Sequence, residues 1–171
     1  IEPNATARRI ANDKEPNTVF DINSLSELPL GSFDVITLWH VLEHVENLSE
    51  YISILKNMLA DHGKLIIAVP NFKSDDANYY KEFWAAFDVP RHLWHFSQKS
   101  IQELFKSVQM KVVKTHPLKF DSFYVSLLSE KNKTGKTNFA KAFWIGLKSN
   151  LSARSTKEYS SLIYELKHKQ N

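Results

Sequence analysis

The side chains best suited to chemistry gather in two short segments of this sequence. His40, Glu43 and His44 follow directly on an apolar run, and Arg91 and His92 stand side by side further along the chain. A histidine near neutral pH can take a proton from a hydroxyl group, and an arginine can hold an anionic group. We therefore expect acid–base chemistry, with His44 and His92 as candidate bases and Arg91 as a candidate anchor for substrate.

The spacing His40-x-x-Glu43-His44 also matches the inverted zinc-protease pattern, in which two histidines on one helical face bind the metal. That geometry requires a helix through His40. The residues before His40 instead predict a strand, because Phe33 to Leu38 is rich in β-branched and aromatic side chains. We therefore do not favour a zinc protease.

The elements around this cluster predict a strand, a helix and a second strand. Phe33 to Leu38 is the first strand, and Gly63 stands where the helix is expected to end. Lys64 to Val69 is a nearly continuous apolar run, typical of strands covered on both faces. The helix between them is indicated by one apolar stripe: Leu48, Tyr51, Ile52, Leu55 and Leu59. This βαβ unit predicts an α/β fold.

Other segments predict a single domain over residues 1–171, with helical insertions at about 72–90 and 121–153. Short strands are expected at Thr18 to Ile22, Met110 to Pro117 and Tyr159 to Leu166. Further helices are expected at Ala5 to Asp13, Tyr79 to Phe87, Ser97 to Ser107, Phe123 to Glu130 and Phe139 to Leu151.

Composition narrows the class of protein. The 171 residues include no cysteine, which excludes disulfides and thiolate metal sites. No apolar run reaches the roughly 18 residues of a membrane span, and no leader opens the chain, so we expect a cytoplasmic protein. Since the chain starts at Ile1, we expect it to be part of a longer protein. Residues 131–171 carry nine Lys and Arg against two Asp and Glu.

Three segments together resemble class I S-adenosylmethionine-dependent methyltransferases, in particular the broad group that contains the ubiquinone-biosynthesis O-methyltransferases. They are Phe33 to Val45, which includes Val41-Leu42-Glu43-His44-Val45, then Gly63 to Asn71, and Asp88 to Ser97. The resemblance covers roughly residues 1–118. It implies a Rossmann-like sheet with helices on both faces and an antiparallel final strand. The first strand and its glycine-rich loop are not found in this sequence.

The resemblance implies S-adenosylmethionine as cofactor, bound at the carboxyl ends of the strands. Glu2 matches the acidic residue that accepts hydrogen bonds from the ribose hydroxyls. Asp21 matches the residue near the adenine amino group, and the backbone N–H of Ile22 completes the adenine contact. Trp39 and His40 lie where the loop after the fourth strand approaches the methionine end of the cofactor.

Some relatives of this type hold a divalent ion with a Glu-x-x-Glu-His motif and a later histidine. Here His40 replaces the first glutamate, and Glu43, His44 and His92 remain as possible ligands. Because hard cations prefer oxygen ligands, the lost carboxylate disfavours magnesium, and we assign no metal.

The function that follows is methyl transfer from S-adenosylmethionine to a small-molecule acceptor, at oxygen. A methyltransferase acting on RNA or another large anionic acceptor is one alternative, favoured by the basic residues 131–171 with Phe143, Trp144 and Tyr159 among them. A non-catalytic binding module of the same fold is another, favoured by the missing glycine-rich loop. The sequence leaves the acceptor, the acceptor atom and the oligomeric state open.

Overall fold

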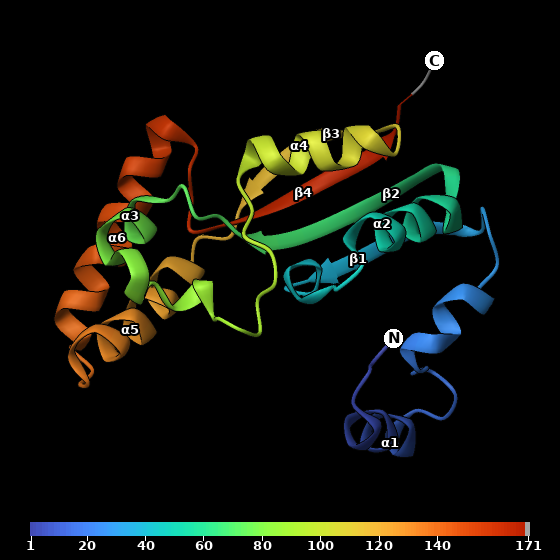
Figure 1. Cartoon of the computed structure of the whole chain (residues 1–171), viewed down its shortest axis with the longest axis horizontal. Coiled ribbons are helices and arrows are strands. Elements are labelled where there is room, and N and C mark those ends of the chain that lie inside the picture. The colour runs from blue at the N-terminus through green and yellow to red at the C-terminus, as the bar shows by residue number, and fades with distance from the viewer. Residues whose placement is uncertain (170–171) are drawn as a thin grey trace.

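The fold is built on a mixed sheet of four strands. The computed structural model describes residues 1–169, without the side chains at positions 23, 24 and 26. The strands are β1 (Phe33–Trp39), β2 (Leu59–Pro70), β3 (Met110–Pro117) and β4 (Ser161–His168), in the spatial order β1-β2-β4-β3 (Figure 1). β1 runs parallel to β2, whereas β4 is antiparallel to both of its neighbours. The α/β class and the antiparallel final strand are confirmed.

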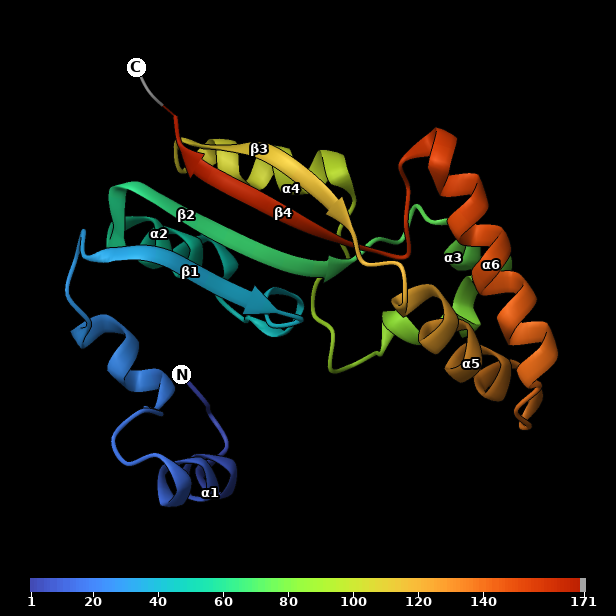
Figure 2. The same cartoon turned by 180° about the vertical axis from the view of Figure 1, so that it is seen from behind.

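Two helices cover one face of this sheet. α2 (Leu48–Met58) connects β1 to β2, and α4 (Gln98–Ser107) precedes β3, with the Ser97 side chain accepting a bond from the Ser100 amide at its start. Both lie on the same side of the strands in Figure 1, and Figure 2 shows the opposite face. On that opposite face Val35 and Trp39 of β1 are exposed.

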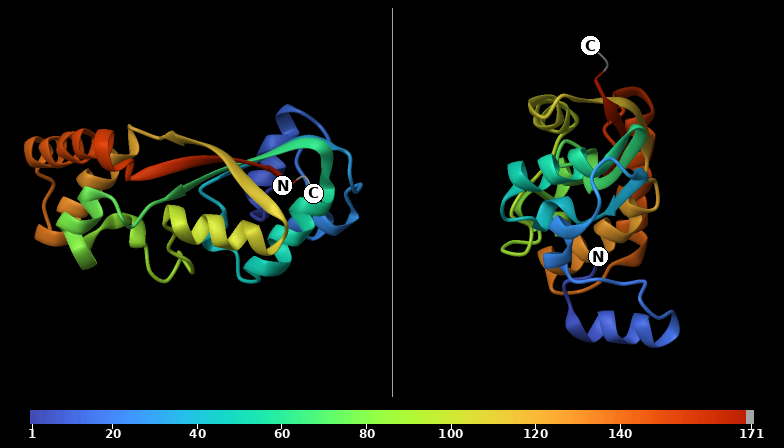
Figure 3. Two further views of the ribbon diagram at one scale, coloured as in Figure 1. Left: turned by 90° about the horizontal axis from the view of Figure 1, so that it is seen from above. Right: turned by 90° about the vertical axis from the view of Figure 1, so that its right-hand side faces the viewer.

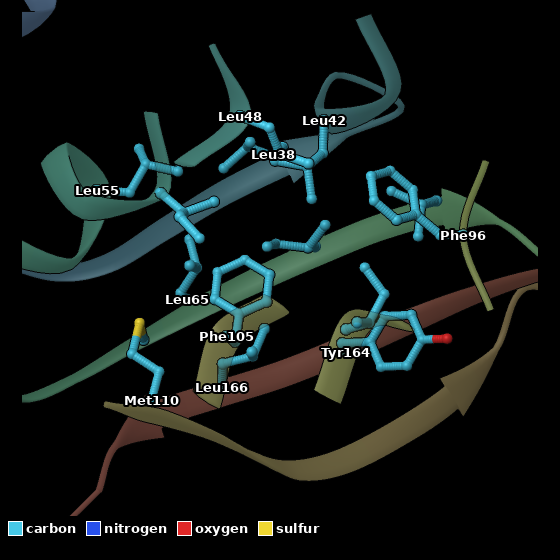
Figure 4. Close-up of a cluster of buried hydrophobic side chains, with 14 of the residues drawn as sticks. Leu38, Leu42, Leu48, Leu55, Leu65, Phe96, Phe105, Met110, Tyr164 and Leu166 are labelled. Carbon is cyan, nitrogen blue, oxygen red and sulfur yellow. The ribbon is translucent and has the colours of Figure 1, made fainter. Parts of the chain in front are cut away.

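The main hydrophobic core lies between the sheet and these two helices (Figure 4). Alternate residues of each strand point into it, as a strand with one covered face requires. Leu65 and Leu166 are fully buried at its centre, opposite Phe105 of α4. The predicted inward face of α4 is confirmed, since Ile101 and Phe105 are buried and Leu104 packs against the same core.

A second group of helices lies beyond the carboxyl ends of β1 and β2 (Figures 1 and 3). It comprises α3 (Asp75–Tyr80), the short 3-10 turns Lys81–Phe83 and Ala85–Phe87, α5 (Asp121–Thr134) and α6 (Phe139–Thr156). α5 and α6 approach closely at Gly146, where a Cβ would lie 2.9 Å from the carbonyl oxygen of Ser122. Among the helices of residues 1–169, none has the length and apolar character needed to cross a membrane.

The buried carboxylate of Asp76 ties this helical group to the sheet. Asp76 is fully buried on α3 and accepts three side-chain hydrogen bonds. The donors are the Trp84 indole N–H at 2.8 Å, the Ser149 hydroxyl of α6 at 2.6 Å and the Ser160 hydroxyl before β4 at 2.7 Å. Because a buried carboxylate is tolerated only when its oxygens are paired, this network fixes α3, α6 and the start of β4 relative to one another.

The N-terminal segment stands apart from the sheet. α1 (Ala5–Lys14) buries none of its residues, and a 3-10 helix follows at Ile22–Glu27 (Figures 1 and 3). The strand predicted at Thr18 to Ile22 is wrong, since no strand forms there. A strand needs a continuous ladder with a neighbour, and this segment has a single such backbone bond, from the Glu2 N–H to the Phe20 carbonyl at 3.0 Å.

The expectation that Gly63 ends a helix is also wrong. α2 ends at Met58, and Gly63 lies within β2. A glycine is needed at position 63 because of a close contact between strands, and not because a helix ends there. A Cβ at this position would lie 2.7 Å from the Phe33 carbonyl oxygen and 2.8 Å from Leu59 Cγ, so only glycine lets β2 pass the start of β1.

Replacing Asp76 with alanine is expected to lower the free energy of unfolding by about 3 kcal/mol, because the Trp84 N–H and two hydroxyls lose their buried partner. Urea denaturation followed by circular dichroism measures the change. The matched control is Asp75→Ala, which removes a surface ion pair to Lys148 (3.5 Å) and is expected to cost less than about 1 kcal/mol. Equal losses in the two variants would contradict the role of the Asp76 network.

Candidate functional site

The turn after β1 places His40 between two acidic side chains. β1 ends at Trp39, and His40 adopts a positive φ of 51°, a conformation in which histidine is enriched. Its Nδ1 lies 3.1 Å from Glu43 Oε1, and its Nε2 lies 3.1 Å from Asp121 Oδ2 at the start of α5. Carboxylates only accept hydrogen bonds, so both ring nitrogens must donate. The bonds to Asp121 and Glu43 raise the pKa of His40 to about 9.

This geometry excludes the zinc-protease arrangement. The chain turns at His40 instead of entering a helix, and only a single 3-10 turn, Leu42–His44, follows. His40 and His44 therefore do not share a helical face.

Glu43 is the buried carboxylate of the site, with 1% of its surface exposed. Its Oε1 contacts His40, whereas its Oε2 has no protein partner. The Glu43 carbonyl also accepts the backbone N–H groups of Leu93 (2.8 Å) and Trp94 (3.2 Å), which attaches the loop at 88–96 to the turn after β1. The sequence identified Glu43 only as a metal ligand, because burial and the lack of a partner at one oxygen are tertiary properties.

The same loop brings His92 against His44. The two rings lie edge to face with centroids 4.7 Å apart. His44 Nδ1 is 3.0 Å from the Arg91 carbonyl, and His92 Nδ1 is 2.8 Å from the Ala86 carbonyl. Since a carbonyl accepts only, each Nδ1 carries the proton, and in the neutral ring Nε2 retains a lone pair. Each histidine is thus held in the tautomer that a base or a metal ligand needs.

Glu43, His44 and His92 could together hold a divalent ion, as one ligand atom from each lies within 4.8 Å of the others. Two imidazoles and one carboxylate are a recognised ligand set for divalent transition metals, and both histidines have the carbonyl support typical of such ligands.

A cavity of about 510 Å³ opens beside this cluster, at the carboxyl ends of β1 and β2. Its polar wall includes His40, Glu43, His92 and Asp121, and its apolar wall includes Tyr124 and Leu128 of α5. Its volume lies in the range of small-molecule sites. Asp121 was not anticipated from the sequence, because nothing in its local pattern indicates that α5 meets the turn after β1.

Arg91 and Asp88 stand together at the rim of this cavity. The Arg91 Nη2 atom is 2.7 Å from Asp88 Oδ1, and the Arg91 side chain is 76% exposed. His44, by contrast, is not among the residues that line the cavity. Of the three predicted catalytic residues, Arg91 and His92 therefore line the cavity, and His44 contacts the His92 ring without lining it.

The predicted cofactor residues fall into two groups. Glu2, Asp21 and Ile22 lie in the N-terminal segment. Arg8 links the first two of these, since it contacts Asp21 Oδ2 at 2.7 Å and donates to the Glu2 carbonyl at 2.7 Å. Trp39 and His40 lie at the end of β1. The cavity is lined by His40 but by none of the other four, so Glu2, Asp21 and Ile22, which were predicted to contact ribose and adenine, lie outside its lining.

The order of strands and the antiparallel β4 define an open α/β fold, and its cavity lies at the carboxyl ends of parallel strands, where such folds bind ligands. Residues 1–115 match the family described as "Methyltransferase domain", and the chain belongs to this family. It is a methyltransferase domain, in a class whose cofactor is S-adenosylmethionine. The sequence matches no curated protein.

Solved structures of methyltransferases share this fold. A SAM-dependent methyltransferase from Thermotoga maritima is 16% identical, with a TM-score of 0.61 over 99% of this chain and 71% of that one. A SAM-dependent methyltransferase from Archaeoglobus fulgidus is 15% identical (TM-score 0.57; 96% and 73%). The mitomycin 7-O-methyltransferase MmcR is 11% identical (TM-score 0.56; 95% and 38%). The chain thus spans between 38% and 73% of the length of these proteins.

The protonation of His40 predicts a pH dependence of stability. Because the folded pKa of about 9 lies above the ordinary 6.5, the bonds to Glu43 and Asp121 stabilise the fold fully below pH 6.5 and are lost as the pH rises through about 9. We expect the difference in unfolding free energy between the wild type and His40→Asn to shrink over this range, measured by urea denaturation. Asparagine is the chosen replacement because it tolerates the positive φ at this position, so the backbone of the turn is retained.

His62→Asn is the matched control, because its pair with Asp34 (2.6 Å) is highly exposed. A constant difference between wild type and His40→Asn across this pH range would show that His40 does not act through its charge.

Proposed function

We propose that this chain carries the acceptor side of an S-adenosylmethionine-dependent methyltransferase whose acceptor is a small molecule methylated at oxygen. The observation that carries the proposal is the cavity at the strand ends, into which the site presents a buried carboxylate with one unpartnered oxygen, Glu43, and a histidine fixed with its Nε2 lone pair available, His92. A hydroxyl acceptor needs such groups, one to orient its proton and one to remove it.

The residues of this chain fit the cofactor in part. Glu2 would accept the ribose hydroxyls, Asp21 and the Ile22 N–H would meet adenine, and the backbone at Trp39 and His40 would flank the methionine end. These groups supply the polar contacts, whereas the chain holds no glycine-rich loop to approach the rest of the cofactor. When bound, S-adenosylmethionine supplies a methyl group on a sulfonium, whose carbon–sulfur bond breaks in an in-line displacement.

His92 is the base that we propose for the acceptor hydroxyl. Its Nδ1–H is held by the Ala86 carbonyl, so an incoming proton goes to Nε2, and the resulting imidazolium lies 3.8 Å from Asp88 Oδ2. His44 packs edge-on against the His92 ring and keeps it in place. Arg91, at the rim beside Asp88, would hold an anionic group of the acceptor.

A non-catalytic binding module of the same fold is the second candidate. It is favoured by the position of Glu2, Asp21 and Ile22 outside the cavity lining. Methylation of RNA has less support, because Tyr159, one of the three aromatics that suggested it, packs against the sheet core.

Titration calorimetry tests the cofactor site. We expect Glu2→Ala in the natural full-length protein to weaken the affinity for S-adenosylmethionine at least 10-fold, because two hydrogen bonds to a charged group are lost. Glu15→Ala, an exposed glutamate of the same segment, is the control and is expected to bind normally. Failure of both the 171-residue chain and the natural full-length protein to bind S-adenosylmethionine would favour the binding module.

Transfer of a labelled methyl group to a panel of phenols and catechols, with amines for comparison, tests the chemistry. We expect His92→Gln to lower kcat by about 10²–10⁴-fold with little change in cofactor affinity. His95→Gln is the matched control, since His95 bonds the Phe87 carbonyl in the same loop and does not line the cavity. Transfer to amines alone, or an undiminished rate in His92→Gln, would contradict the proposal.

A further inference from the structure

The outer surface of α6 exposes large apolar side chains. Phe139, Phe143, Trp144 and Leu151 are 71%, 55%, 66% and 49% exposed. The opposite side of the helix is used for packing, and its buried residues are the small ones: Ala142, Gly146, Ser149 and Ala153. A group of exposed aromatics on one helix is unusual for a surface that meets only water, and it indicates an interaction site.

This surface is also strongly basic. Residues 131–157 contain seven Lys and Arg and no Asp or Glu. Lys141 and Lys148 form ion pairs with Glu130 and Asp75 of neighbouring helices. Lys133 lies exposed in the last turn of α5, Lys136 lies exposed between α5 and α6, and Arg154 lies exposed near the other end of α6. Positive charge therefore flanks the exposed aromatics at both ends of the helix.

We propose that the outer surface of α6, with Lys133 and Lys136 before it, docks on an anionic lipid bilayer. An interfacial helix combines an apolar side, which enters the boundary between headgroups and acyl chains, with basic residues attracted to anionic lipids. Trp144 and the two phenylalanines suit the apolar role, since aromatic rings favour the headgroup level. The helix lies on the bilayer and does not cross it, in keeping with its composition.

The observations favour a bilayer over a nucleic acid. Single-stranded RNA binds in grooves where successive bases stack on aromatic faces. Here the aromatics project from the outside of a helix, and Phe139, Phe143 and Trp144 do not line the cavity at the strand ends. One face of Phe143 is already stacked on Phe123, with centroids 5.4 Å apart.

Docking of α6 has a consequence for the site. α5, which packs along α6, supplies Tyr124 and Leu128 to the apolar wall of the cavity. A bilayer held by α6 would therefore lie one helix away from the cavity, where an acceptor with an apolar portion could enter from the lipid.

Sedimentation of the 171-residue chain with phosphatidylcholine vesicles, with and without phosphatidylglycerol, tests the proposal. We expect binding only when phosphatidylglycerol is present, weakened by salt. Lys133→Gln with Lys136→Gln is expected to reduce the partition coefficient roughly 30-fold, since each basic residue near the surface contributes about 1 kcal/mol. Phe139→Ser with Trp144→Ser is expected to reduce it at least 10-fold.

Lys99→Gln with Lys106→Gln is the matched control, because it removes the same charge from exposed positions of α4 and is expected to bind normally. Circular dichroism of each variant shows whether its helices are retained. Absence of binding to anionic vesicles would overturn the proposal, and so would an equal loss in the α4 control. Tighter binding to a single-stranded RNA oligonucleotide, weakened by the same α6 variants, would replace the bilayer with a nucleic acid.

Discussion

The buried carboxylate of Asp76 is the point at which the sheet and the helical group are joined. Its three donors come from Trp84, from α6 and from the residue before β4, so segments far apart in the sequence meet at one side chain. The helical group has only a small apolar core of its own, centred on Tyr80 and Trp84. Directional hydrogen bonds in a dry environment therefore set the position of these helices more precisely than their apolar contacts do.

The candidate site depends on how the helical group is placed against the sheet, because one wall of the cavity comes from the sheet and the other from the helical group. The turn after β1 contributes His40 and Glu43, and α5 contributes Asp121 together with the apolar wall. A protonated His40 bridges the two carboxylates and so connects strand to helix a second time. The imidazolium also offsets the charge of Glu43, which allows a buried carboxylate to keep one oxygen without a protein partner.

Much of the fold could be predicted from the sequence because its signals are local. The apolar run from Lys64 to Val69, the stripe beginning at Leu48 and the helix predicted at Ser97 to Ser107 each depend on neighbouring residues, and all correspond to observed elements. The prediction of a strand at Thr18 to Ile22 was wrong because a strand is stabilised by a neighbouring strand that its own residues do not specify. The prediction that Gly63 ends a helix was wrong because a glycine required by the close approach of β1 and β2 cannot be told, from sequence, from a glycine that ends a helix.

The sequence by itself determined the residue types of the site: the spacing of His40, Glu43 and His44 after a strand, and Arg91 and His92 in a later loop. Tertiary structure alone decided which of them lie in contact. It turned His40 toward Asp121, placed His44 behind His92, and left one oxygen of Glu43 without a partner. Burial, tautomer and pairing arise from atoms contributed by distant segments, and a local pattern carries no information about those atoms.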